Sequence, residues 1–342
     1  MSPHRPRTTI KDIARESGVS LSTVSLVLNN HPRISEETRR KVRAVVDRHD
    51  YQPNSQAQGL ASRSSRVFAV VVPPLRHVFA DIYFGEVISG VHDYTQEIGF
   101  KLMLEVANPR FLREKEYLRL LETRRADGML HVASTIGDTH LLAFEDNQRP
   151  FLLVNNHFPG SRLNYIMADY AETGRLAAAT LTGLGHRRIG FIRGEFVQSA
   201  DTLRESFLQA CRDRGCTGHD LVEATTDFSE EGGRRAALRL LVDRPELTAL
   251  MAGNDRMAIG ALRAAAELGR SVPGSLSVMG VDDIPSARFT TPALTTIRHD
   301  HYAIGKRAAE RLHRLASREI PSCQETLPVD LVVRESTGPV PR

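Results

Sequence analysis

Residues 9–30, TIKDIARESGVSLSTVSLVLNN, contain two short helical patterns joined by a glycine. Thr9 belongs to the residue types that cap helices, and Ile13 and Ala14 then fall on one face at helical spacing. Gly18 suits the left-handed backbone that a tight turn between two helices requires. The stretch predicts a helix, a turn and a second helix.

The second helix has an apolar stripe and a polar outer face. We expect Ser20 to cap it, and we expect its buried residues to be Val24, Val27 and Leu28. Facing away are Leu21, Ser22, Ser25 and Leu26. A third helix is predicted from Ser35, with Val42, Val45 and Val46 on its buried face.

Positive charge is concentrated in the same region. Residues 1–66 contain 12 Lys and Arg against 6 Asp and Glu, whereas the other 276 residues contain 33 against 35. A basic module with short polar side chains on its second helix is typical of a helix-turn-helix that enters the major groove of DNA. The alternative is a small helical bundle that binds nothing.

From residue 66 onward, short apolar runs alternate with helical stretches. The runs are VFAVVV, KLMLEV, GMLHVA, PFLLVN, RIGFIRG, LTALMAG and LSVMGVDD. Continuous apolar runs are typical of strands buried on both faces, hence of parallel sheets flanked by helices. The fold class is therefore α/β, with an all-α headpiece in front of two such half-domains.

Several of these segments resemble the LacI/GalR family of bacterial transcription regulators. The resemblance rests on TIKDIARESGVSLSTVSLVLN, RISEETRRKV, YQPNSQAQGLA, LGHRRIGFIRG, AGNDRMAIGALRAAAELGRSVPGSLSVMGVDDIPSARFTTPALTTIR and LVVRESTG, which span nearly the whole chain. It implies a headpiece at 1–52, a hinge at 53–66 and a periplasmic-binding-protein-like core at 67–342. The core would divide into an N-subdomain at about 67–167 and 299–327 and a C-subdomain at about 168–298 and 328–342.

The resemblance also implies which residues contact DNA. Leu21, Ser22 and Leu26 match base-reading positions, and Leu26 departs from the polar residue that most members carry there. Leucine packs on a thymine methyl rather than pairing with guanine, which predicts a different operator, unless Leu26 points to solvent or to the third helix. The expected phosphate contacts are Thr8, Thr9, Ser20, Thr23, Ser25, Asn29 and Arg39.

The hinge segment, PNSQAQGLAS at 53–62, has weak helix propensity and is expected to fold on binding DNA. By resemblance, Leu60 would wedge into the minor groove, and Gln58 is included among the DNA contacts. Gly59 makes the hinge helix more dependent on DNA and on a partner chain, since glycine costs about 1 kcal/mol in a helix. A plain flexible linker is the alternative.

The core is expected to bind a small molecule at the carboxyl ends of its strands. Asn155, Asn254 and Asp282 follow predicted strands, and Asp282 and Asn254 match effector-contacting positions of the family. Asp255 and Asp283 are equally suited to capping backbone. By resemblance, the other candidates are Tyr83, Phe84, Arg204 and Phe228. Phe228 could instead be a core residue and Arg204 a surface residue, and the residues around 76–82 depart from the family pattern.

Enzyme signatures are missing from the sequence. It contains no GxGxxG after a strand and no GxxxxGK[ST], HExxH or GxSxG, so we expect no catalytic residue and no cofactor. His299 and His301 would share one face of an extended segment and could ligate a metal ion, but the sequence offers no further ligand, so we expect no metal.

These observations favour a ligand-responsive DNA-binding regulator, interpreted as a repressor, that binds a palindromic operator as a homodimer. Its small-molecule effector is expected to be a sugar or sugar derivative. The three cysteines match no metal spacing, and neither an export signal nor a membrane span is evident, which favours a cytoplasmic, nucleoid-associated protein. A solute-binding protein and a cytoplasmic α/β enzyme with a DNA-binding appendage are the alternatives.

Overall fold

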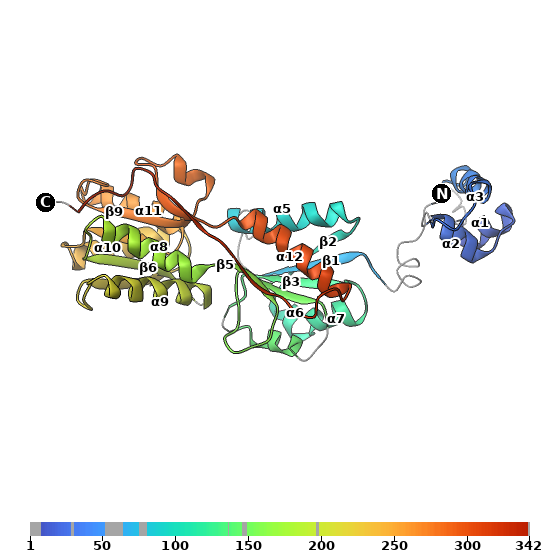
Figure 1. Ribbon diagram of the computed structural model, residues 1–342, viewed down its shortest axis with the longest axis horizontal. Coiled ribbons are helices and arrows are strands. Elements are labelled where there is room, and N and C mark those ends of the chain that lie inside the picture. The colour runs from blue at the N-terminus through green and yellow to red at the C-terminus, as the bar shows by residue number, and fades with distance from the viewer. Residues whose placement is uncertain are drawn as a thin grey trace, which may run out of the picture. The chain divides into compact units, whose positions relative to one another are not determined.

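The computed structural model describes residues 8–28, 31–51, 64–74, 81–135, 137–145, 149–195 and 198–340 (Figure 1). The chain forms two compact units, residues 1–65 and residues 66–342, which are described one at a time. Asn29, Gln58, Gly59 and Leu60, together with most of the hinge prediction, lie outside the described residues.

The first unit contains the three predicted helices, α1 Ile10–Ser17, α2 Leu21–Leu28 and α3 Glu36–Arg48. The Asp12 carboxylate accepts from the backbone amide of Thr9 at 3.0 Å and from its hydroxyl at 2.7 Å, which fixes the start of α1. Gly18 ends α1 at φ 68°, as expected from its place in the turn. Ser20 accepts from the amide of Thr23 at 3.1 Å and so caps α2.

A small hydrophobic core holds these helices together. Its buried members are Ile13, Ala14, Val24, Val27, Val42 and Val45. Leu28 and Val46, also expected inside, are partly buried and pack against this cluster. The apolar stripe of α2 therefore faces α1 and α3, which leaves the opposite side of α2 for other contacts.

The second unit begins with a six-stranded sheet in the order β11-β5-β4-β3-β1-β2, with every neighbouring pair parallel. Its strands are β1 Val67–Val72, β2 Lys101–Val106, β3 Gly128–Val132, β4 Phe151–Val154, β5 Tyr165–Ala168 and β11 Gln324–Leu327. Helices α5 Ile82–Glu97 and α12 His301–Ala316 cover one face, and α6 Pro109–Arg113, α7 Glu116–Glu122 and the 3-10 helix η2 Thr139–Phe144 cover the other. We call this part the N-lobe.

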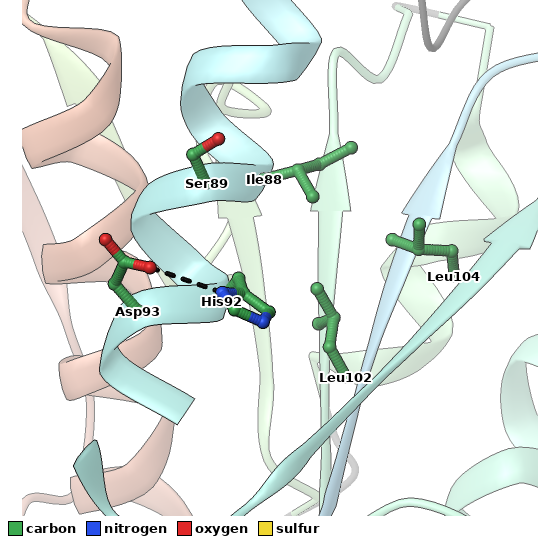
Figure 2. Close-up of a pocket in the computed structure, with 6 residues that line it drawn as sticks. All are labelled: Ile88, Ser89, His92, Asp93, Leu102 and Leu104. Atoms are coloured by element: carbon green, nitrogen blue, oxygen red, sulfur yellow. Dashed lines mark hydrogen bonds and ion pairs between the residues drawn. The ribbon is translucent and has the colours of Figure 1, made fainter. Parts of the chain in front are cut away.

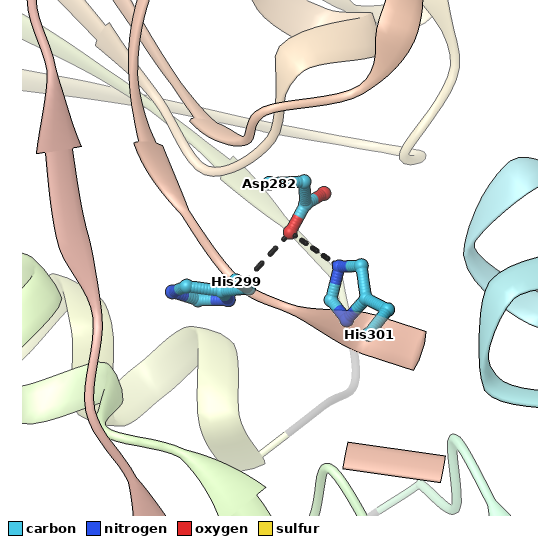
Figure 3. A group of neighbouring side chains, drawn as sticks. All are labelled: Asp282, His299 and His301. Atoms are coloured by element: carbon cyan, nitrogen blue, oxygen red, sulfur yellow. Dashed lines mark hydrogen bonds and ion pairs between the residues drawn. The ribbon is translucent and has the colours of Figure 1, made fainter. Parts of the chain in front are cut away.

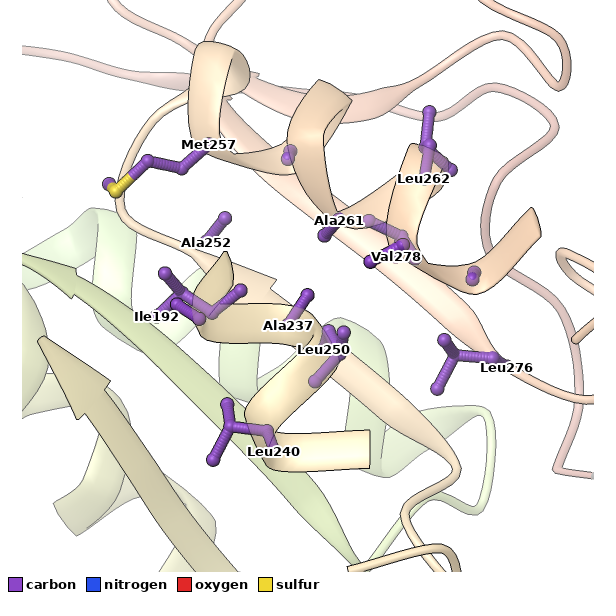
Figure 4. Close-up of a cluster of buried hydrophobic side chains, with 14 of the residues drawn as sticks. Ile192, Ala237, Leu240, Leu250, Ala252, Met257, Ala261, Leu262, Leu276 and Val278 are labelled. Atoms are coloured by element: carbon purple, nitrogen blue, oxygen red, sulfur yellow. The ribbon is translucent and has the colours of Figure 1, made fainter. Parts of the chain in front are cut away.

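A second six-stranded sheet has the order β12-β10-β9-β8-β6-β7. Its strands are β6 Ile189–Gly194, β7 Leu221–Thr226, β8 Ala249–Ala252, β9 Ser277–Asp282, β10 Thr295–Arg298 and β12 Asp330–Val332. Helices α8 Tyr170–Gly183 and α9 Gln198–Asp213 cover one face, and α10 Glu230–Asp243 and α11 Asp255–Glu267 cover the other, where they bury a cluster of aliphatic side chains (Figure 4). The short 3-10 helix η3 Pro285–Arg288 follows β9. We call this part the C-lobe.

The chain crosses between the lobes three times, after β5, after β10 and after β11. The first two crossovers place residues 169 and 299–300 between the lobes, and the last joins β11 to β12 at residues 328–329. Because the crossovers follow the carboxyl ends of β5 and β10, they bring residues near these strand ends together at the junction of the lobes.

All seven apolar runs form strands, so the α/β interpretation is confirmed. The one departure from parallel pairing is β12, which pairs with β10 in the antiparallel sense among the strands of the described chain. Cys211, Cys216 and Cys323 are all buried as free thiols. Within the described segments, we find no helix whose length and hydropathy would allow it to cross a bilayer.

Candidate functional site

Helix α2 exposes two of the three residues that are predicted to read bases. Leu21 has 44% of its surface accessible, and Ser22 is exposed, whereas Leu26 is half-buried at the far end of the helix. An exposed leucine beside an exposed serine contributes little to the headpiece core, so both side chains are available to a groove of DNA.

Other predicted DNA contacts are engaged within the headpiece. The Ser20 hydroxyl lies 2.7 Å from that of Ser22 and 2.8 Å from that of Thr23. Only 12% of the Arg39 side chain is exposed, and it binds Glu36 at 3.2 Å and the carbonyl of His31 at 3.1 Å. Arg39 therefore anchors the segment between α2 and α3. Thr8 is half-buried and Ser25 is half-buried on α2.

A second candidate site lies at the junction of the lobes. Four residues directly after or at the ends of strands adopt positive φ angles, namely Ala133 at 52°, Asn155 at 55°, Asp282 at 111° and Asp283 at 56°. Non-glycine residues in this region of φ cost about 1–3 kcal/mol each and cluster where function requires them. The strain therefore marks the carboxyl ends of β3, β4 and β9.

Asp282 lies between two imidazoles (Figure 3). Its Oδ1 is 3.0 Å from Nε2 of His301 and 3.6 Å from Nδ1 of His299. Because His301 belongs to α12 of the N-lobe and Asp282 ends β9 of the C-lobe, the shorter contact joins the lobes. Asn155 extends the chain of contacts, with its Nδ2 3.3 Å from Nδ1 of His301.

Aromatic rings enclose this group. Tyr83 meets the His301 ring edge-on at 4.8 Å between centroids, and Tyr170 meets His299 in the same way at 5.0 Å. Burial raises the pKa of both tyrosines above their usual range. Tyr83 is partly exposed overall, but its hydroxyl is buried and interacts with the side chain of Asn155.

Asn254 and Phe228 lie together at another part of the same edge of the C-lobe sheet. Asn254 caps α11 by accepting from Met257 at 2.8 Å and donates to the carbonyl of Phe228 at 3.2 Å. Gly194, the last residue of β6, leaves room for the Phe228 ring, which a β-carbon at that position would overlap. Phe228 thus covers the end of β6, and its role toward an effector stays a prediction.

Three other candidates have structural roles. Phe84 is 5% exposed and belongs to the N-lobe core. Asp255 is fully buried and accepts from the Thr296 hydroxyl at 2.6 Å and the Ile284 amide at 2.9 Å. Asp283 pairs with Arg298 at 2.9 Å and with Arg334, instead of capping backbone.

The prediction for Arg204 has to be corrected. Its guanidinium pairs with Glu223 of β7, partly exposed to solvent, because neighbouring Leu203 takes the buried position on α9. A different cation, Arg193, lies at the carboxyl end of β6, 3.0 Å from Asp201. Its Nε is buried with no partner among the described atoms. Sequence reasoning missed Arg193 because it sits inside an apolar run.

A further ion pair also escaped the sequence. Arg256 of α11 in the C-lobe lies 2.6 Å from Asp81, which caps α5 in the N-lobe, and 2.7 Å from Glu230. Together with the contact between His301 and Asp282, it ties the two lobes.

The two histidines do gain a third potential metal ligand. The ligating atoms of Asp282, His299 and His301 all lie within 4.8 Å of one another. The sequence had suggested no such partner, because Asp282 is 17 residues away from His299 along the chain.

Comparison with known proteins finds matches for both parts of the chain that contain a candidate site. Residues 9–54 match the model of the bacterial regulatory proteins of the lacI family, and residues 178–337 match a periplasmic binding protein-like domain. The chain is 33% identical over 303 residues to the transcriptional regulator GalS of Salmonella typhimurium, covering 88% of each chain. The chain belongs to the LacI family.

Other members and their structures agree. The HTH-type transcriptional repressor PurR of Yersinia enterocolitica is 33% identical over 338 residues, which cover 97% of this chain and 98% of PurR. The crystal structure of the lac repressor dimer bound to operator and the anti-inducer ONPF has a TM-score of 0.85 at 26% identity, covering 97% of this chain and 100% of that one. The expected family, fold and DNA-binding regulator are confirmed.

Proposed function

We propose that this LacI-family protein is a repressor that binds a palindromic operator as a homodimer. Its affinity for the operator would fall or rise when a small molecule binds between the lobes. The observation that carries the proposal is the exposed side of α2, where Leu21 and Ser22 are accessible. The opposite side of the helix, with Val24 and Val27, is buried in the core of the headpiece. Two such helices, one from each chain, would read the two half-sites.

In this proposal, α2 reads bases through Leu21, Ser22 and Leu26, and residues 53–66 form a hinge with Gln58 and Leu60 at the minor groove. The remaining DNA contacts, to phosphates, would be Thr8, Thr9, Ser20, Thr23, Ser25 and Asn29. Arg39 supports them by positioning the loop after α2, as its contacts with Glu36 and His31 indicate.

The effector site would include Tyr83, Asn155, Phe228, Asn254 and Asp282, with Arg193 in place of Arg204. Support comes from the strained backbone at Asn155 and Asp282 and from the buried hydroxyl of Tyr83 beside Asn155. A sugar derivative suits carboxylate and amide groups beside aromatic rings. We propose that the protein only binds this ligand and catalyses no reaction on it, and that it acts at the nucleoid in the cytoplasm.

The homodimer would use the edge of the N-lobe. A groove of about 380 Å³ runs between α5 and β2 and is lined by Ile88, Ser89, His92, Asp93, Leu102 and Leu104 (Figure 2). Leu104 is 43% exposed there, on the edge strand of the sheet. The similarity to the lac repressor dimer supports a homodimer, and the exposed apolar side chains make this edge the surface that we propose for the second copy.

Selection from a pool of random duplexes tests the proposal and identifies the operator in the same experiment. The full chain should enrich a palindromic sequence, and fluorescence anisotropy should then show binding at least a thousandfold tighter than to a scrambled duplex, weakening steeply as salt rises. The proposal would be contradicted if no sequence were enriched, or if the protein bound the enriched and the scrambled duplex with equal affinity at low and at high salt.

A further inference from the structure

Three side chains that suit a transition-metal ion converge at the junction of the lobes (Figure 3). Asp282 ends β9, His299 lies in the crossover after β10, and His301 is the first residue of α12. Their ligating atoms all lie within 4.8 Å of one another, and both imidazoles are buried. Two imidazoles and a carboxylate are ligands that zinc and related divalent ions prefer, whereas magnesium and calcium take oxygen ligands.

The distances between these atoms suit one ion that all three side chains bind. Bonds of about 2.1 Å in a tetrahedral zinc site place the ligand atoms about 3.4 Å apart. Oδ1 of Asp282 lies 3.0 Å from Nε2 of His301 and 3.6 Å from Nδ1 of His299, which are both close to this spacing. Because no pair of ligating atoms is more than 4.8 Å apart, the two imidazoles would have to approach each other by no more than about 1.4 Å.

The neighbours of His299 hold its ring in the orientation that a metal ligand requires. The Thr173 hydroxyl lies 2.8 Å from the carbonyl of Asp169, to which it donates, and 2.8 Å from Nε2 of His299, whose hydrogen it accepts. Nδ1 therefore faces Asp282, and no atom of the described chain forms a hydrogen bond with it. Metal-binding histidines have this pattern, in which an oxygen atom holds the N–H that does not bind the ion. The orientation is the same for a neutral and a doubly protonated ring, because an ion replaces any proton on Nδ1.

His301 would have to change one hydrogen bond when it binds an ion. With the ion on Nε2, its Nδ1 carries the proton and needs an acceptor. This nitrogen lies 3.3 Å from Nδ2 of Asn155, whose Oδ1 accepts from the amide of Ala168 at 3.1 Å. Turning the Asn155 oxygen toward His301 would take the acceptor away from Ala168. A carboxylate at position 155 would accept from both groups, so Asn155 lowers the affinity for an ion.

We propose that Asp282, His299 and His301 bind a divalent transition-metal ion such as Zn²⁺ between the lobes. A water molecule would also satisfy Nδ1 of His299 and Oδ1 of Asp282, but His301 adds a third ligand that a water does not need. This inference goes beyond the proposed function, which gives no role to a metal. Since Asp282 belongs to the C-lobe and His301 to the N-lobe, the ion would link the lobes. Three protein ligands leave a fourth position for water or for an oxygen atom of the effector.

Calorimetry with Zn²⁺ tests the site in the full-length protein, without an affinity tag and after treatment with a chelator. The protein should bind one Zn²⁺ per chain, more tightly than it binds Mg²⁺ or Ca²⁺. His299→Gln and His301→Gln should each weaken zinc binding at least about tenfold. His313→Gln is the control and should bind as the wild type does, because that histidine contacts Tyr94 and Phe100. Thermal unfolding without metal shows whether each variant is folded.

Position 155 gives a test in the opposite direction. Asn155→Asp should strengthen zinc binding about tenfold, because the carboxylate accepts from His301 and from the Ala168 amide together. Asn254→Asp is the matched control, since Asn254 follows a strand of the C-lobe but caps α11 and has no contact with the three ligands in the described chain. Its affinity for zinc should stay within about twofold of the wild type.

X-ray absorption by the zinc-loaded wild type identifies the ligands without any variant. The spectrum should show two imidazoles and oxygen ligands at about 2.0–2.2 Å from the ion. The absence of zinc binding, a site with sulfur ligands or without imidazole, equal affinity in His299→Gln and the wild type, or no gain in Asn155→Asp would overturn the inference. Operator selection without added metal is scored separately, so a protein that selects an operator but binds no zinc refutes this inference alone.

Discussion

Asp255 shows how a single buried carboxyl shapes stability. It is fully buried at the start of α11, and burial, followed by the charge of Asp282, raises its pKa well above the usual value. A carboxyl whose pKa is raised in the folded state stabilises the protein at pH values below about 3.8, which is the pKa of this carboxyl in the unfolded state. That stability is lost as pH rises toward the folded pKa.

Asp255→Asn should therefore stabilise the protein relative to wild type at pH 7, by about 1 kcal/mol or more, since one unit of pKa shift equals about 1.4 kcal/mol. The amide oxygen can still accept from Ile284, and the Thr296 hydroxyl can turn to accept from the amide nitrogen. Urea unfolding at pH 5 and pH 7 measures the effect. A stability gain that is larger at pH 5 than at pH 7 would refute this explanation.

Leu21→Ala tests base reading by one side chain. Because Leu21 is 44% exposed, the change should alter headpiece stability by less than about 0.5 kcal/mol. Affinity for the selected operator should fall by about 1–3 kcal/mol while affinity for scrambled DNA stays the same. Anisotropy titrations against both duplexes measure this, and an equal loss on both would show that Leu21 reads no base.

At the residue scale, the sequence predicts where a side chain lies in the fold better than it predicts which other side chain it contacts. Asp282 and Asn155 follow recognisable strands, so their place at the sheet edges was predictable. The pairing of Arg204 with Glu223 was not, because it depends on which side of α9 faces the core. The partnership of His299 with Asp282 and Thr173 required the crossover geometry, which no local pattern encodes.

Helix packing in the C-lobe depends on a glycine. A β-carbon on Gly174 of α8 would lie 2.6 Å from both the Leu203 carbonyl oxygen and the Phe207 nitrogen of α9. Gly183, at the end of the same helix, has nothing within 4 Å of such a carbon. The close approach of α8 to α9 therefore requires a glycine at position 174 but not at position 183.

Gly174→Ala should lower the free energy of unfolding by about 1–3 kcal/mol, because backbone atoms of α9 would have to move. Gly183→Ala is the matched control and should be neutral or stabilising by up to about 1 kcal/mol. Denaturant unfolding of the two variants compares them. Equal effects at the two positions would contradict the packing argument.

Most strands with strong burial were predictable from the sequence, and of the four edge strands only β2, formed by the run KLMLEV, was. The runs that form β1, β3, β6, β8 and β9 are buried nearly throughout and therefore read as continuous apolar segments. Strands β7, β11 and β12 lie at sheet edges, alternate or lack burial, and contain polar residues. Their formation depends on a neighbouring strand, which a local window of sequence does not show.

At the scale of the whole core, two polar contacts between described side chains join the lobes. One is the hydrogen bond from His301 to Asp282 at 3.0 Å, and the other is the ion pair between Arg256 and Asp81 at 2.6 Å. About a third of the Arg256 side chain is exposed, so solvent weakens the ion pair to the order of 1 kcal/mol or less. A ligand with a modest preference for another arrangement could therefore shift the lobes.

Arg256→Gln should widen the distribution of distances between the lobes without unfolding either one. Spin labels on exposed residues of each lobe, read by pulsed electron paramagnetic resonance, measure it. Arg263→Gln is the control, since Arg263 lies on the same helix and pairs with Glu267 of that helix at 3.0 Å. If both variants leave the distribution unchanged, the ion pair between Arg256 and Asp81 does not restrain the lobes.

Coupling between the two candidate sites is the central claim, and one titration tests it most directly. The affinity of the full chain for its selected operator would be measured alone and with saturating amounts of each sugar, sugar phosphate, amino sugar and nucleobase in turn. We expect one compound to change the affinity by about 5- to 150-fold, and operator to change the affinity for that compound by the same factor. Operator binding that no compound alters would contradict a ligand-responsive regulator.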